Sequence, residues 1–329
     1  MLLVAAFSSC GQQPTRADEV AAVPRRFAAD GAAVSWPDAI AAIEASDRYG
    51  GIKLQVHEGL QPIGMDAQSK LWEFVHLASG AKGKEIPTRD LATGRIVPDG
   101  DMGIVLVLLP GGTVWMGAQK DDPSKPNFDP GAQQDEGPVH QVTLSPFFVG
   151  KHEVTRGQWL RWAGDVQGGV DEPGEALHAR PVTEVSWSDV DAALGKVGLQ
   201  LPTEAQWESA CRAGTGTPWW TGANARDVSR GAVAGLAPCA SVGSKEPNDL
   251  GLHDTLGNVS EWCRDGYGQY PSTAVADPFV ASGLGRVFRG GSWNGPTESC
   301  RSAMRGSGDP GVRYNLVGFR VGLDAVRAR

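Results

Sequence analysis

The order of apolar and polar residues divides the chain into stretches of helical and of strand-like spacing. Residues 36–43 repeat apolar positions at helical spacing, whereas residues 52–56 alternate like a strand. The strongest strand signal is residues 104–109, an uninterrupted apolar run that ends at a Pro-Gly-Gly turn. Residues 113–117 follow that turn directly and are predicted to be the hairpin partner of this strand.

The second half of the pattern predicts more short elements. Residues 140–144 and 147–149 have the composition of strands, and helices are predicted to begin after Thr155, Ser186 and Thr203. A Ser or Thr before a helix accepts a hydrogen bond from its free first-turn N–H groups. The chain beyond these helices reads as turns and short strands. The pattern therefore predicts an α+β fold with short helices and much irregular loop.

Composition and charge limit the classes of function. Hydrophobic residues make up 41% of the 329 residues, which is enough for a packed core. The 44 glycines and 22 prolines favour turns over long helices. The net charge of −8 provides no basic surplus to neutralise phosphates, so we expect no nucleic-acid partner.

The amino terminus resembles the signal segment of bacterial lipoproteins. An apolar run leads through two serines to Cys10, so residues 1–10 are predicted to direct export and Cys10 to carry a lipid. We accordingly expect a location in the bacterial cell envelope or periplasm, with the membrane contacted only through this anchor. Residues 11–35 are predicted to be a tether, and residues 36–103 an N-terminal extension of unknown role.

Five strings, in order along the chain, resemble the formylglycine-generating enzyme (sulfatase-modifying factor) family. They are LLPGGTVWMG at 108–117, LPTEAQWE at 201–208, NDLGLHDTLGNVSEW at 248–262, RGGSW at 289–293 and VGFR at 317–320. The resemblance runs over residues 104–323 and leaves residues 324–329 as a tail. It implies the family's C-type-lectin-like fold, with short helices and small twisted antiparallel sheets. One fold serves several functions, so the resemblance alone assigns no activity.

A calcium site is expected in the third of these strings. Asp254 and Glu261 stand on either side of a Gly-Asn turn, an arrangement that can collect the oxygen ligands that Ca²⁺ prefers. The resemblance implies a structural Ca²⁺ held by Asp254, Gly257, Val259 and Glu261. The alternative is that this segment is only a turn with Glu261 as a cap or surface charge.

The copper chemistry of the family is not expected here. It uses two cysteine thiolates, soft ligands for Cu(I), in the segment after RGGS. Gly295 stands at the first cysteine position, and Cys300 is not expected to fill either one. No catalytic residue is assigned, and Cys300 is predicted instead to lie within bridging distance of Cys211 as a possible disulfide. An oxidase of a peptide cysteine or of another small thiol, by a different route, is the alternative.

A binding role is predicted for the last part of the chain. Retroelement-diversified variable proteins use the same fold, and residues 289–321 resemble their variable segment. The candidate ligand-binding residues are Trp293, Asn294, Glu298, Met304, Ser307, Asp309, Tyr314 and Asn315. Polar and aromatic side chains of these kinds suit an adaptable binding surface, although such residues also fill ordinary loops. The function predicted is a non-catalytic protein that binds a protein, peptide or small-molecule ligand.

Overall fold

The computed structural model describes residues 34–90, 92–163 and 178–325. Its helices are short: α2 (Trp36–Glu44), α3 (Arg156–Trp162), α5 (Trp187–Lys196) and α6 (Glu204–Arg212). The short 3-10 helices are η1 (Asp47–Tyr49), η2 (Leu77–Ser79), η3 (Gln134–Glu136), η4 (Ala225–Arg230) and η5 (Thr297–Cys300). Within the described ranges, none of the helices has the length and hydropathy needed to cross a bilayer.

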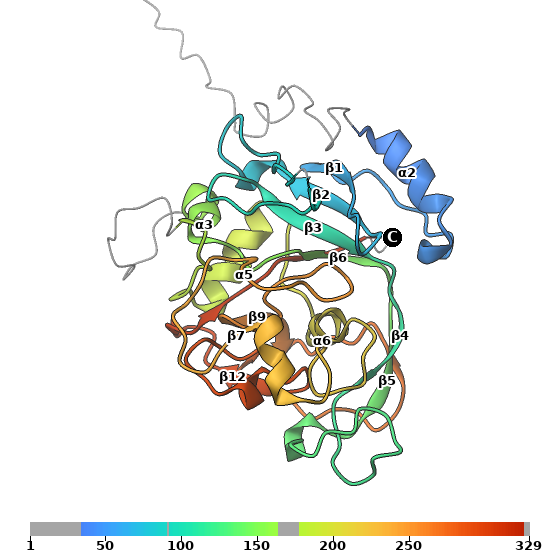
Figure 1. The fold of residues 1–329 in the computed structure, drawn as a ribbon, viewed down its shortest axis with the longest axis vertical. Coiled ribbons are helices and arrows are strands. Elements are labelled where there is room, and N and C mark those ends of the chain that lie inside the picture. Colours follow the sequence, from blue (N-terminus) through green and yellow to red (C-terminus); the bar gives the residue numbers. More distant parts are fainter. Residues whose placement is uncertain (1–33, 91, 164–177, 326–329) are drawn as a thin grey trace, which may run out of the picture.

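A five-stranded antiparallel sheet forms one half of the molecule (Figure 1). Its strands, in spatial order, are β1 (Leu60–Met65), β2 (Trp72–His76), β3 (Ile104–Leu109), β6 (Phe147–Gly150) and β14 (Gly322–Asp324). The strand predicted at residues 52–56 is wrong, because β1 begins only at Leu60. The sheet thus combines two strands from residues 36–103 with three strands from the remainder of the chain.

The predicted hairpin of residues 104–109 with 113–117 is wrong. Both edges of β3 are occupied by β2 and β6, so the strand that follows it must pair elsewhere. Gly111 turns the chain with a φ of 74°, and a Cβ there would lie 2.2 Å from the carbonyl oxygen of Leu144. The turn therefore directs the chain out of the first sheet.

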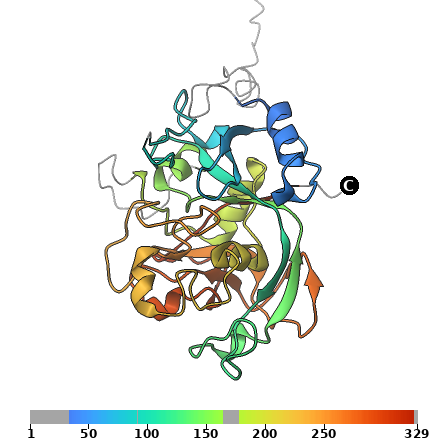
Figure 2. The same cartoon turned by 45° about the vertical axis from the view of Figure 1, so that its right-hand side comes forward.

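A separate three-stranded ribbon receives the chain after this turn. It consists of β4 (Gly112–Met116) beside β5 (His140–Leu144), with β10 (Val275–Ala276) on the other edge of β5. β4 is antiparallel to β5 and β10 is parallel to it. Figure 2 shows the ribbon curving away from the first sheet along the side of the molecule.

The predicted helix starts are confirmed. Thr155, Ser186 and Thr203 each accept a hydrogen bond from the backbone N–H three residues later, and each cap forms a reciprocal capping box. These signals are local in sequence, which is why residue spacing was sufficient to place them.

A four-stranded sheet carries the second half of the molecule. Its order is β12 (Arg305–Gly308), β11 (Arg286–Arg289), β9 (Ser260–Gly266) and β13 (Val317–Gly318), and a short pair, β7 (Ala232–Val233) and β8 (Leu256–Gly257), lies beside it. β9 lies between β11 and β13, antiparallel to the first and parallel to the second. The sheet therefore brings the 248–262, 289–293 and 317–320 strings together.

Two buried histidines are expected to make stability depend on pH. Burial lowers the pKa of His76 to about 4 and that of His253 to about 3. Both are neutral in the folded protein near pH 6, whereas the unfolded chain takes up protons near pH ~6.5. The contribution of these histidines to the free energy of unfolding is complete above pH ~6.5, and it is lost as the pH falls toward 4.

We expect each histidine to lower the free energy of unfolding by ~3 kcal/mol over that interval, measured with urea for His76 as the difference between the parent protein and a His76→Gln variant. The His76→Gln variant should show a shallower fall. An equal slope in this variant and the parent protein would contradict the assignment.

Candidate functional site

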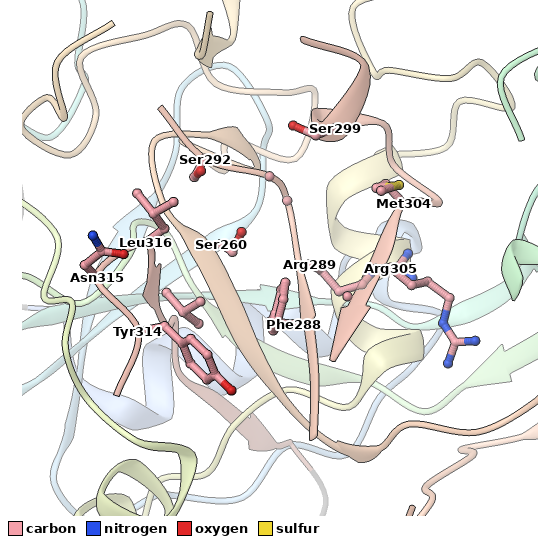
Figure 3. Close-up of a pocket in the computed structure, with 14 residues that line it drawn as sticks. Ser260, Phe288, Arg289, Ser292, Ser299, Met304, Arg305, Tyr314, Asn315 and Leu316 are labelled. Atoms are coloured by element: carbon pink, nitrogen blue, oxygen red, sulfur yellow. The ribbon is translucent and has the colours of Figure 1, made fainter. Parts of the chain in front are cut away.

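A cavity of about 310 Å³ opens where β9, β11 and β13 meet the loops that follow them (Figure 3). Its lining comes from three segments distant in sequence: Ser260, then Phe288 to Ser292 with Ser299, Met304, Arg305 and Gly306, and finally Tyr314 to Val317. The RGGSW string forms one wall. The cavity is the candidate functional site because it lies where the family strings converge.

Two glycines shape this wall. Gly290 and Gly291 follow β11 with φ values of 96° and 71°, a region that residues with a Cβ seldom adopt. A Cβ on Gly291 would lie 2.7 Å from the carbonyl oxygen of Ser299 and 2.8 Å from the Cys300 Sγ. The turn therefore packs backbone to backbone against η5, which places the Ser292 and Ser299 hydroxyls beside the same cavity (Figure 3).

The charged side chains behind the cavity are paired with each other. Arg289 donates to Glu204 at 2.9 Å and to Glu208 at 2.5 Å, and its side chain has no exposure. Arg305 donates to Glu204 at 2.6 Å and lies 4.0 Å from the ring centre of Tyr270. This network fixes the floor of the site and leaves each guanidinium with a carboxylate partner inside the protein.

The surface of the cavity offers uncharged groups. Three serine hydroxyls and the Asn315 amide can form hydrogen bonds, while Phe288, Met304 and Leu316 provide apolar walls. The Tyr314 hydroxyl accepts a hydrogen bond from the Asp309 N–H at 3.1 Å. In the described part of the chain, no carboxylate, histidine, lysine or cysteine lines the cavity. A serine here has no neighbouring base to activate it as a nucleophile.

The structure brings some of the predicted ligand-binding residues together. Met304, Tyr314 and Asn315 line the cavity, and Glu298 lines a neighbouring one. The remaining four, Trp293, Asn294, Ser307 and Asp309, line neither cavity. Sequence reasoning missed Ser260 and Phe288. Ser260 lies inside the 248–262 string, but only the pairing of β9 with β11 and β13 shows that it reaches the site.

The predicted disulfide is not formed. Cys211 and Cys300 lie in one buried apolar cluster, but both are free thiols. The Cys211 thiol instead donates to the Thr255 carbonyl oxygen at 3.4 Å and lies 3.7 Å from the Ser302 Oγ. Burial raises the pKa of Cys211 to about 11 and that of Cys300 to about 12. Both thiols are therefore protonated at neutral pH.

The two carboxylates of the expected calcium site have different surroundings. Glu261 accepts hydrogen bonds from Arg320 on both oxygens, each at 2.6 Å, and from the Trp207 indole at 2.7 Å. Asp254 accepts one bond on Oδ2, from the Gly243 N–H at 2.7 Å. Its Oδ1 is buried without a hydrogen-bond partner among the described residues.

The surroundings of the two carboxylates decide which of them could bind a cation. Burial raises the pKa of Asp254 to about 6, and burial together with the charge of Asp254 raises the pKa of Glu153 well above its usual range. Glu261 already has an internal cation, whereas Asp254 does not. No group of three His, Cys, Asp or Glu side chains among the described residues is arranged for a metal. A Ca²⁺ here would therefore need Asp254 and the backbone oxygens of Gly257 and Val259.

Calcium binding at Asp254 stays a prediction with a direct test. We expect Ca²⁺ to raise the melting temperature relative to chelator-treated protein, because an ion that binds only the folded state stabilises it by ~2.7 kcal/mol at 100 times its Kd. The Asp254→Ala variant should lose this response. Asp249→Asn, a change at an exposed carboxylate, should keep it. Identical melting curves with Ca²⁺ and with chelator in the parent protein would refute the site.

Comparison with known proteins supports the resemblance seen in the sequence. Residues 98–325 match the family described as "Sulfatase-modifying factor enzyme 1-like domain". The serine/threonine-protein kinase pkn1 of Chlamydia pneumoniae is 34% identical over 216 residues, which cover 57% of this chain and 34% of the kinase. The chain thus spans about a third of the length of that relative. The formylglycine-generating enzyme of Thermomonospora curvata is 28% identical over 292 residues, covering 67% of this chain and 93% of the enzyme.

A solved structure shows the same architecture. Variable protein 1 of Treponema denticola superposes with a TM-score of 0.57 and 25% identity, covering 69% of this chain and 98% of its own. The predicted α+β, C-type-lectin-like fold is therefore confirmed.

Proposed function

The chain belongs to the sulfatase-modifying factor enzyme 1-like family, and from that premise we propose that it is a non-catalytic protein that binds a ligand in the cavity beside the RGGSW string. The observation that carries this proposal is the chemistry of the lining. Hydroxyls, an amide, glycine backbone and apolar side chains face the cavity, and its two arginines are already paired with buried carboxylates. Such a lining binds and orients a guest without exchanging protons with it.

The cysteine inventory argues against copper-dependent oxidation. Gly295 provides no thiol, and Cys300 is fully buried as a neutral thiol behind Gly291. Two exposed thiolates are the soft ligand pair that Cu(I) would need. The residues present do not fit this metal, so we assign no redox step to the site.

The ligand that suits the cavity has an uncharged polar end and an apolar body. Ser260, Ser292 and Asn315 can each donate to and accept from a polar group. Phe288 and Leu316 supply the apolar contact (Figure 3). A peptide segment or a small molecule of this kind is the class proposed.

The proposal is tested by filling the cavity. A fixed panel of neutral small molecules is screened by saturation-transfer NMR against the parent protein and the Asn315→Trp variant. Asn315 is exposed and lines the cavity, so the larger ring should occupy it without disturbing the core. We expect binding signals that are lost in this variant and retained in Asn294→Trp, at an exposed position outside the cavity. Signals that survive Asn315→Trp, or no signals at all, would reject the site.

We further propose that the protein is exported and anchored in a bacterial envelope through a lipid on Cys10. The support is the sequence of residues 1–10, which lie outside the described residues. In a bacterium that processes lipoproteins, labelled palmitate should enter the parent protein and should not enter Cys10→Ser. Equal labelling of the two would reject the anchor.

A further inference from the structure

A second and larger cavity, of about 680 Å³, lies beside the first. Its lining includes two aromatic rings and three prolines: Phe128, Trp219, Pro130, Pro218 and Pro296. Ser299 and Met304 line both cavities, so the two spaces share a wall. Neither the expected calcium site nor the proposed function uses this second space.

Two buried polar side chains in the apolar wall of the second cavity, Arg301 and the Trp219 indole, are occupied. Arg301 pairs with Asp129 at 2.8 Å and with Glu136 at 2.6 Å, and its side chain is only 4% exposed. The Trp219 indole N–H donates to the Thr297 carbonyl oxygen at 3.1 Å. This part of the wall therefore presents ring faces and aliphatic carbon to a guest.

Two carboxylates line this space, and Glu298, unlike the Asp129 that pairs with Arg301, has no cation partner among the described residues. Glu298 is exposed, lines the cavity and forms no salt bridge with any residue in the described ranges. The Glu298 carboxylate accepts a long hydrogen bond, 3.3 Å, from the hydroxyl of the neighbouring Thr297. A cation held beside the rings would thus meet an unpaired negative charge.

We propose that the second cavity binds a small aromatic amine, a flat ring with a positively charged substituent. The ring would pack against Trp219 and Phe128, for which aromatic contact is favourable beyond area burial alone. The ammonium group would lie at Glu298 and near ring faces that also attract cations. This inference goes beyond the proposed function, because the second cavity shares only the wall residues Ser299 and Met304 with the first.

Two probes with the same ring and opposite charge test the chemistry. Isothermal titration at low salt should give tryptamine at least ~10-fold tighter binding than indole-3-acetate, because the carboxylate attracts one and repels the other. Glu298→Gln should remove most of this preference while leaving the ring contacts. Equal affinity for the two probes in the parent protein, or no binding of tryptamine, would overturn the proposal.

Two filling variants locate the binding. Ala223 is exposed and lines only the second cavity, so Ala223→Trp should reduce tryptamine binding by at least ~10-fold. Asn315→Trp, which fills only the first cavity, should leave it unchanged. Loss of tryptamine binding in Asn315→Trp, with binding retained in Ala223→Trp, would overturn the second site while leaving the first intact. Retained tryptamine binding without any panel signal at the first cavity would reject only the proposed function. Melting curves confirm that each variant is folded, and the exposed Glu298→Gln change provides a test independent of the filling variants.

Discussion

Replacing Arg289 by methionine is expected to destabilise the protein by ~3–5 kcal/mol, the cost of leaving buried carboxylates without their cation. Arg289 bridges Glu204 and Glu208, and the side chains of both acids are at most 5% exposed. Methionine fills part of the same volume but donates no hydrogen bond. The loss should appear as a lower midpoint in urea with an unchanged slope.

The matched control is on the same strand. Arg286 also lies in β11, but it is only partly buried, with its guanidinium 3.8 Å from the ring centre of Trp187. Arg286→Met should cost no more than ~1 kcal/mol, the scale of an exposed cation–π contact. A similar cost for both variants would show that the buried pairs contribute nothing beyond a surface contact.

Incubation with a peptide that carries the sulfatase cysteine motif is expected to give no aldehyde product, with or without added copper. Gly295 provides no thiol at the first cysteine position, and Cys300 is buried as a neutral thiol. Mass spectrometry of the peptide measures the outcome, with the Thermomonospora curvata enzyme as the positive control.

Restoring one cysteine is not expected to restore the reaction. A Cβ at Gly295 would lie 2.7 Å from the Ser299 Oγ, so the side chain of Gly295→Cys would meet this hydroxyl. Cys300 would remain beneath Gly291. Aldehyde formation by the parent protein at a rate near that of the control enzyme would instead establish the oxidase alternative.

Local signals in the sequence predicted local structure well. Caps at Thr155, Ser186 and Thr203 depend on residues three positions apart, so their spacing was sufficient to place the helices. The pairing of β3 depends on β2 and β6, which are separated from it along the chain. The apolar run therefore identified the strand but not its partners, and the adjacent segment was wrongly assigned to it.

At the candidate site, too, features within one segment were predicted and contacts between distant segments were not. Residues 289–321 were predicted to bind a ligand, and Arg289 to Ser292 of this segment form one wall of the cavity. The partner of Glu261 could not be predicted, since Arg320 lies 59 positions away and meets it only in the folded core. Likewise, the contacts of the Cys211 thiol with Thr255 and Ser302 join residues far apart in the sequence, so no spacing rule contains them.

The mixed origin of the five-stranded sheet bears on where the chain can be cut. Lys151 is buried, and its ion pairs are with Glu73 at 2.7 Å and Asp66 at 3.6 Å, both outside the segment that matches the family. A fragment of residues 98–325 would leave this ammonium without either carboxylate partner and would uncover the edge of β3 that β2 now protects. An open apolar strand edge recruits other chains. The family segment is thus expected to aggregate when it is produced alone, because residues 34–97 supply the strand β2 that covers this edge.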